Sequence, residues 1–488
     1  MEQIKKFASD ISWILIGSVV NLSIGFLLSI FLARWLGVAD LGLYRMVITI
    51  QGIAGLFTAF GIPGALTKYV AEYKNDINKL SQIITSGITS QLIFGMATSI
   101  LLCALSGILA SIFSMPQLAH LLRILAIAFP FTSLFQSLIG SLNGLREMRT
   151  YAYLVISQTA LMILFIAILT SLGLGVQGVV FGIVLSMIGG CIGGLYISRR
   201  LLSLNFRGYT QNAKRLISFG SLMFGANALS VIATYTDVIL IGYFLMAKDI
   251  GYYSIAIILS NLLLSLPQAI QMITYPATAE YWSQNNSAAL QRVIDKSMKY
   301  SACILLPVGL GIGFFAKEIV TLLYGQDFIP AALPLCVLLI ARVIRGSTAV
   351  PIGGSFSGIG RPDLALKIDA ISVGTNVVLN ALLIPRFGIM GAAIATTTSL
   401  LLGNMIFFAL IPRVMKLKID FKWFAQAIGL AAIAVALFWG GSNFISHYIV
   451  GGVILLAYVA LVLMRFITRE DRDIFKSLVN ALISRKVT

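Results

Sequence analysis

Residues 11–33 read ISWILIGSVVNLSIGFLLSIFLA, a run of 23 residues without a charge that ends before Arg34. A helix adds about 1.5 Å per residue, so roughly 20 apolar residues cross the hydrocarbon core of a bilayer. Lys5 and Lys6 precede the run, as in a signal peptide, but the run is too long for one and lacks a cleavage site of the A-x-A type. We therefore expect a first membrane-spanning helix that is retained.

Similar apolar runs follow one another along the 488 residues, of which 58% are hydrophobic and only 11% charged. Soluble domains carry about 25% charged residues, which they need to cover their surface. Outer-membrane barrels would instead show segments of about 10 residues with alternating polarity, and we find none. The composition predicts an all-α polytopic membrane protein.

Apolar runs bounded by charges or turn residues predict about fourteen spans, with twelve as the alternative. They begin near residues 11, 42, 83, 119, 150, 176, 217, 250, 298, 331, 364, 389, 422 and 444.

Lys and Arg support an even number of spans, because cytoplasmic connections carry an excess of these residues. If the N-terminus is cytoplasmic, nearly all basic residues outside the spans fall on its side. The opposite side keeps only Arg34, Lys248, Lys317 and Arg386. We therefore expect a multi-pass protein of the cell (cytoplasmic or inner) membrane with both termini in the cytoplasm.

The chain also repeats itself in order. LGVADLGLY at 36–44 returns as LMAKDIGYY at 245–253, AEY at 71–73 as AEY at 279–281, and GVQG at 175–178 as GIMG at 388–391. Six spans separate each copy from its partner, which gives both halves the same orientation, as in parallel transporter repeats.

We therefore expect two pseudo-symmetric six-helix bundles and two further helices. The expected bounds are 1–203, 204–418 and, for the added pair, 419–467, followed by a cytoplasmic amphipathic tail at 468–488. Apolar residues recur every four positions in this tail beside basic ones, which suits a helix lying on anionic lipid; a solvated basic tail is the alternative.

Prolines interrupt several of the predicted spans. They are candidate hinges, although proline is common in membrane helices: Pro63, Pro130, Pro267, Pro307 and Pro351.

Charges inside spans are the first functional candidates, because they are costly there and usually face a protein interior or an aqueous cavity. Arg342 and Arg345 lie deep in the tenth span on one helix face. Asp237 lies deep in the seventh span, and Arg34 and Arg45 lie near the outer ends of the first two. Guanidinium groups bind phosphate in bidentate fashion, so this set predicts a cationic cavity for a phosphate or pyrophosphate.

Other interpretations compete for some of these residues. Arg34, like Arg123 and Arg386, can reach the headgroup region as a membrane anchor, and Asp237 can neutralise an arginine inside the protein. Arg123 stays a further candidate for the cavity. Uncharged polar residues could line a space for sugar or join helices by hydrogen bonds: Asn21, Gln51, Asn227, Gln271, Asn376 and Asn380.

The sequence argues against an enzyme and against a nucleic-acid binder. Its two histidines, His120 and His447, lie far apart, and no phosphate loop, nucleophile elbow or metal-ligand spacing appears. The net charge of +17 comes from basic residues between apolar runs rather than from one basic soluble face. No cofactor or metal is expected. Transport would be driven by substrate flux, membrane potential or an ion gradient, with Na⁺ and H⁺ as the candidate ions.

FLARWLG at 31–37, DLGLY at 40–44 and TDVILIGYF at 236–244 resemble the polysaccharide transporter and oligosaccharide flippase family. This Wzx-like family belongs to the multidrug/oligosaccharidyl-lipid/polysaccharide (MOP) flippase superfamily. The resemblance implies an alternating-access carrier that moves a lipid-linked oligosaccharide, a polyprenyl-pyrophosphate sugar unit, for cell-surface polysaccharide such as lipopolysaccharide O-antigen. It implies contact with membrane lipids, and polysaccharide polymerase and chain-length machinery as candidate partners. The family's cationic cavity corresponds in character to Arg34, Arg45, Arg342 and Arg345.

Two relatives within the superfamily remain as alternatives. A peptidoglycan-precursor flippase would share fourteen spans and a cationic cavity. A cation-coupled drug exporter would prefer acidic cavity residues and twelve spans, so the arginines argue against it.

Overall fold

The structure, a computed structural model, describes residues 2–199, 205–419, 421–444 and 446–466, with side chains from Ser23 to Arg465 within these ranges. Among these residues, eleven helices are long and apolar enough to cross a membrane, or up to thirteen if each of two bent pairs is one crossing. The prediction of an all-helical polytopic membrane protein is confirmed. The tail at 468–488 and the side chain of Asn21 lie outside the described residues.

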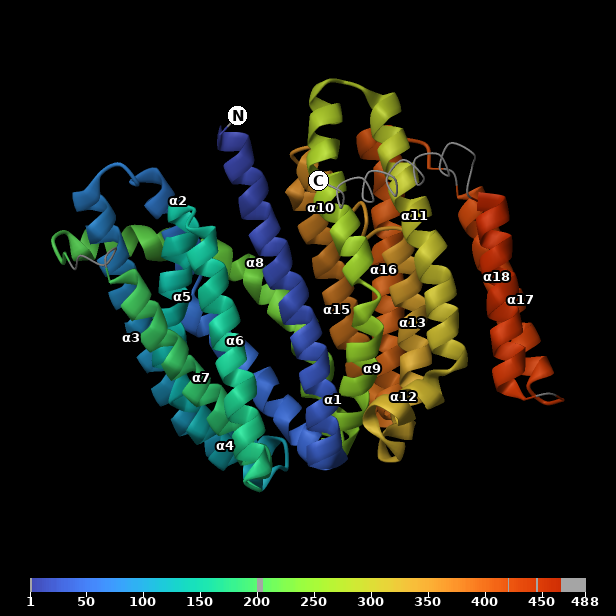
Figure 1. Cartoon of the computed structure of the whole chain (residues 1–488), viewed down its shortest axis with the longest axis horizontal. Helices are drawn as coiled ribbons and strands as arrows, with labels where there is room; N and C mark the ends of the chain where they lie inside the picture. The colour runs from blue at the N-terminus through green and yellow to red at the C-terminus, as the bar shows by residue number, and fades with distance from the viewer. Residues whose placement is uncertain (1, 200–204, 420, 445, 467–488) are drawn as a thin grey trace, which may run out of the picture. The chain divides into compact units, whose positions relative to one another are not determined.

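The chain divides into two compact units, Met1–Ser254 with Asn380–Ala392, and Ile255–Leu379 with the described part of Ala393–Thr488. The bundle bounds expected from the sequence stay a prediction. The first unit is built from α1 (Glu2–Ala59), α2 (Ile62–Glu72), α3 (Ile77–Ile112), α4 (Pro116–Ala126), α5 (Ala128–Leu145), α6 (Met148–Ser171), α7 (Gly175–Ser198), α8 (Tyr209–Phe244) and the start of α9 (Ala247–Leu262) (Figure 1).

The second unit begins within α9 and contains the helices that form its main cavities. They are α10 (Ser265–Ser283), α11 (Ser287–Phe314), α12 (Ala316–Tyr324), the 3-10 helix η1 (Gln326–Ala331), α13 (Ala332–Ser347), α14 (Ser355–Gly358), α15 (Pro362–Phe387, up to residue 379), α16 (Ile389–Met415, from residue 393), α17 (Lys422–Gly441) and α18 (His447–Phe466).

The helix count differs from fourteen because the first two predicted spans lie in the single element α1. Its backbone leaves helical geometry at Gly37, where φ is 75° and ψ is −178°. A positive φ of this size favours glycine, which has no Cβ to clash with the backbone. Each of the other predicted spans corresponds to one long helix or one bent pair.

Four of the five prolines named above lie just after a helix end. Proline clashes with the carbonyl four residues earlier and cannot donate to it. Accordingly, α1 ends four residues before Pro63, α4 four residues before Pro130, and α13 four residues before Pro351. The α9 helix ends five residues before Pro267. The α4–α5 and α9–α10 pairs bend by 46° and 44°; only Pro307 lies within a continuous helix, α11.

The two copies of the nine-residue repeat pack against each other within the first unit. A Cβ at Gly42 would clash with the backbone of Ala247, and a Cβ at Gly251 would clash with the backbone of Val38. The seventh residue of each copy therefore contacts the third residue of the other. This reciprocal contact explains why both copies keep glycine at the seventh position.

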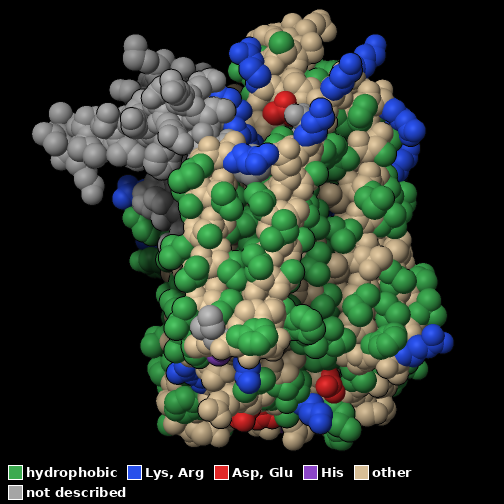
Figure 2. All heavy atoms as spheres, turned by 90° about the vertical axis from the view of Figure 1, so that its right-hand side faces the viewer, with side chains coloured by type: hydrophobic (Ala, Val, Ile, Leu, Met, Phe, Trp, Pro, Cys, Tyr) green, Lys and Arg blue, Asp and Glu red, His purple; other side chains and the backbone are tan. Residues whose placement is uncertain are grey.

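The surface is that of a protein surrounded by lipid. Figure 2 shows hydrophobic side chains over the middle of one face, with Lys and Arg gathered mostly toward one end. On α17 and α18, large apolar side chains such as Trp439 and Met464 are 78% and 74% exposed. Soluble monomers rarely expose contiguous apolar patches of this kind, so these helices face hydrocarbon.

Candidate functional site

The second unit contains a cavity of about 310 Å³ where α13 stops. Beyond Ser347 the chain continues without helix through residues 348–354. Residues of α10, α13, α15 and α16 line the cavity together with this irregular segment. Non-helical backbone at membrane depth is tolerated where it lines a cavity or is buried in protein, and this segment meets that condition.

Arg342 and Arg345, the strongest candidates from the sequence, both line this cavity. They lie one turn apart on α13, and both side chains are half-buried. Nη2 of Arg345 lies 3.7 Å from Oδ1 of Asp369 on α15, and these side chains are 31% and 57% exposed. The pair is thus too long for a hydrogen bond and remains open to the cavity.

Neutral hydrogen-bonding groups complete the lining: Gln268 and Gln271 on α10 and Asn404 on α16. Oδ1 of Asn404 accepts a 3.0 Å hydrogen bond from the hydroxyl of Thr348. Within the described part of the chain, no hydrogen bond is formed by the Asn404 amide N–H groups or by the two glutamine side chains. The cavity therefore offers amide donors beside two guanidinium groups, a suitable combination for phosphate oxygens.

Three of these polar residues were not singled out from the sequence. Asp369 lies in the second turn of its span, where a charge near a helix start is ordinary, and its arginine is 24 residues earlier. Gln268 and Asn404 resemble any polar residue that joins helices. Only the fold brings them to one cavity.

The opposite face of α13 is apolar and lines a second cavity of about 600 Å³, shared with α11 and α17. Its lining consists of hydrophobic residues and glycine, including Leu339 and Val343 of α13 and Trp439 of α17. One helix thus separates a cationic space from an apolar one.

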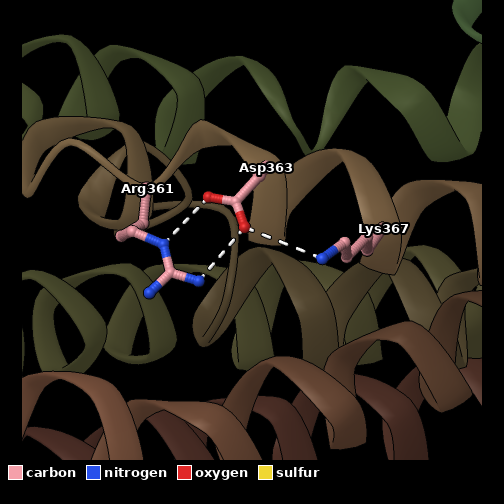
Figure 3. Close-up of polar contacts among 3 residues, drawn as sticks. All are labelled: Arg361, Asp363 and Lys367. Atoms are coloured by element: carbon pink, nitrogen blue, oxygen red, sulfur yellow. Dashed lines mark hydrogen bonds and ion pairs between the residues drawn. The ribbon is translucent and has the colours of Figure 1, made fainter.

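An exposed arginine near α15 provides a contrast to the cavity arginines (Figure 3). Nε and Nη2 of Arg361 donate to the two carboxylate oxygens of Asp363 at 3.0 and 3.1 Å, and Lys367 lies 3.8 Å from the same carboxylate. The carboxylate raises the pKa of the Arg361 guanidinium by accepting these hydrogen bonds. This fully formed surface pair does not line the cavity.

Asp237 lies in a buried polar cluster of the first unit and is 7% exposed. Oδ2 of Asp237 accepts a 2.6 Å hydrogen bond from the hydroxyl of Tyr253, and Oδ1 accepts one of 2.7 Å from the amide of Asn380. These donors make burial of a carboxylate tolerable. This cluster is formed within the first unit, whereas the arginine cavity is formed within the second.

The remaining arginine candidates also belong to the first unit. Arg34 is exposed, and Nε of Arg123 donates to the hydroxyl of Ser106 at 3.2 Å. Arg45 is half-buried beside the Tyr44 ring, and its Nε is buried without a hydrogen-bond partner among the described residues. Arg342 and Arg345, by contrast, line a cavity formed within the second unit.

The uncharged candidates have different surroundings. Gln51 is half-buried and Asn227 is exposed. Asn376 and Asn380 are buried in hydrogen bonds between helices, Asn376 donating to Thr396 at 3.1 Å. The contacts of these two asparagines are those of residues that join helices. Gln271, by contrast, lines the cavity.

A family model described as "Polysaccharide biosynthesis protein" matches residues 31–333, more than half of the chain. The chain belongs to this family. A Haloferax volcanii protein described as "Probable low-salt glycan biosynthesis flippase" is 24% identical over 471 residues, covering 95% of this chain and 97% of the relative. The lipopolysaccharide biosynthesis protein WzxC of Escherichia coli is 23% identical over 422 residues, covering 82% and 79%.

Solved structures show the same fold at low identity. The lipid II flippase MurJ in an inward closed conformation aligns with a TM-score of 0.75 at 16% identity, covering 93% of this chain and 99% of that one. An inward-facing multidrug resistance transporter of the MOP superfamily aligns with a TM-score of 0.62 at 17% identity, covering 82% and 95%. This member of the polysaccharide biosynthesis family is therefore a multi-pass membrane protein with the fold of these two solved transporters.

Proposed function

We propose that this protein flips a lipid-linked oligosaccharide, a sugar unit on polyprenyl pyrophosphate, from the cytoplasmic to the outer leaflet for cell-surface polysaccharide. The observation that carries the proposal is the cavity in which Arg342 and Arg345 face amide groups. Moving a pyrophosphate through hydrocarbon is costly, because a charged group loses its hydration there. Arginines in a protein cavity replace part of that hydration.

The apolar cavity behind α13 supports a lipid-linked rather than a free substrate. Its hydrophobic lining suits part of an isoprenoid chain, which gains free energy for each apolar group removed from water. The headgroup would occupy the arginine side of α13 while the tail stays in the bilayer or in this space. No covalent step is needed, and the two bundles expected from the sequence would rock to expose the headgroup to each side in turn.

Translocation of a fluorescent polyprenyl-pyrophosphate sugar in proteoliposomes tests this function. Loss of a charge-assisted hydrogen bond costs about 1.5–3 kcal/mol, roughly a 10- to 100-fold change in binding. We expect Arg345→Ala and Arg342→Ala each to lower translocation at subsaturating substrate at least tenfold.

Arg361→Ala is the matched control, because it also removes an arginine of this region but lies outside the cavity. It should translocate like the native chain. A native protein that moves no lipid-linked sugar under any imposed gradient, yet moves cationic drugs or a peptidoglycan precursor, would assign it to one of the alternative superfamily functions.

A further inference from the structure

Asp369 has an unusual position for an acidic residue in an anion-binding cavity. It contributes a carboxylate to the same lining as Arg342 and Arg345. A like charge beside a bound phosphate opposes binding, so a carboxylate there needs an explanation. Its carboxylate lies 3.7 Å from the guanidinium of Arg345.

The geometry of the pair shows that it is loosely held. The carboxylate of Asp363, six residues earlier on the same helix, takes two hydrogen bonds of 3.0 and 3.1 Å from Arg361. Among the described residues, the Asp369 carboxylate has only the longer contact with Arg345, and its side chain is 57% exposed. Ion pairs with this much exposure contribute little to stability, typically under about 1 kcal/mol. A ligand that offers Arg345 two phosphate oxygens can therefore replace it.

A half-buried arginine in a membrane helix benefits from a counter-charge when its cavity holds no ligand. A carrier must also release what it binds, since a site that binds too tightly stops transport. One carboxylate can meet both needs. It neutralises the arginine before the headgroup arrives, and it competes with the headgroup afterwards.

We propose that Asp369 is an internal counter-ion for Arg345 that the anionic headgroup displaces on binding. This inference rests on the proposed function and assigns a regulatory role within the same site. Asp369 is a positioning residue rather than a substrate ligand: it sets how tightly the headgroup is held. Displacement also breaks this contact between α15 and α13. Binding of the headgroup would then allow the distance between these two helices to change.

The test measures binding of inorganic pyrophosphate to the full-length protein in detergent by titration calorimetry, together with translocation in proteoliposomes. Removal of a competing charge near the phosphate should strengthen binding. We expect Asp369→Asn to lower the pyrophosphate Kd by roughly three- to tenfold while lowering the maximal translocation rate. Asp369→Glu, which keeps the charge, should restore much of the native behaviour.

Asp363→Asn is the control, because it removes an acid from the same helix outside the cavity and should leave both readouts unchanged. In the Arg345→Ala background, the gain in affinity from Asp369→Asn should shrink, because the two residues act through one contact.

The outcomes separate this inference from the proposed function. If native protein binds pyrophosphate and translocates the lipid-linked sugar, but Asp369→Asn leaves the Kd unchanged or weakens binding, the counter-ion role is wrong and the proposed function stands. If native protein neither binds pyrophosphate nor translocates the sugar, both are overturned. A thermal unfolding scan of each variant identifies any that is misfolded, and Asp369→Glu then supplies the comparison.

Discussion

At the scale of single residues, Asp237 is a carboxylate held inside the protein by two hydrogen bonds. Among the side chains described between Ser23 and Arg465, it is the one Asp, Glu, Lys or Arg that is buried. Its two carboxylate oxygens take hydrogen bonds from Tyr253 and Asn380, on α9 and α15. A carboxylate held this way joins three helices, so loss of its negative charge would alter both hydrogen bonds.

We predict that Asp237→Asn lowers translocation driven by a Na⁺ or H⁺ gradient at least tenfold while pyrophosphate binding persists. Proteoliposomes with each gradient imposed separately give the measurement. Asp249→Asn is the control, because that carboxylate is outside the cluster and accepts a hydrogen bond from the backbone of Met246. Undiminished gradient dependence in Asp237→Asn would limit Asp237 to a structural role.

Stability gives a second readout of the same cluster. Asp237→Ala leaves the Tyr253 hydroxyl and the Asn380 amide without this acceptor, at a cost of about 1–3 kcal/mol. We expect a lower thermal unfolding midpoint than for Asp237→Asn, which keeps the shape and one acceptor oxygen. Equal midpoints for the two variants would indicate that water replaces the carboxylate.

At the scale of elements, the reciprocal contact of the two repeat copies makes a sharp prediction. Gly42→Ala places a methyl group against the Ala247 backbone, so α1 and α9 must separate. We expect a loss of stability of about 1–3 kcal/mol, as in other overpacked sites, measured as a lower unfolding midpoint in detergent. Gly55→Ala, on the same helix with open space around the new Cβ, should be neutral or slightly stabilising.

Gly251→Ala should repeat the effect of Gly42→Ala, because its methyl group would meet the Val38 backbone in the matching position. A variant with both substitutions should lose less than the sum, since separation of α1 and α9 relieves both clashes at once. Additive losses would show that the two contacts are independent rather than one interface.

Local sequence patterns predict the elements well and the site only in part. Apolar runs locate the spans because each membrane helix satisfies its backbone hydrogen bonds within itself, whatever its neighbours are. Pro130 and Pro267 point to the bends because their effect reaches only four residues back. The contact of Asp237 with Asn380 joins residues 143 positions apart, and nothing local to either residue specifies it.

The same distinction applies to the cavity of the second unit. Arg342 and Arg345 are conspicuous because a charge deep in an apolar run is costly by itself. Asp369, Gln268 and Asn404 have ordinary local surroundings, and their role depends on four helices meeting at one place. Sequence therefore predicts the costly residues of a membrane site better than the neutral residues that complete it.

At the scale of the whole molecule, the distribution of Lys and Arg predicts which end of each helix faces the cytoplasm. Two exposed residues, Gln284 and Lys317, can test this orientation, because α11 (Ser287–Phe314) lies between them in the chain. In a chain whose four cysteines are replaced, we expect a membrane-impermeant maleimide to label Lys317→Cys in intact cells. Gln284→Cys should react only after permeabilisation.

Labelling of the two sites together tests both whether α11 crosses the membrane and in which orientation it does so. Labelling of both in intact cells would mean that α11 does not cross the membrane, although its apolar window is long enough. Labelling of Gln284→Cys alone would keep the crossing and reverse the orientation. In that case the basic residues would gather on the outer side, the arginine cavity would have to be loaded from the opposite leaflet, and the proposed direction of flipping would be wrong.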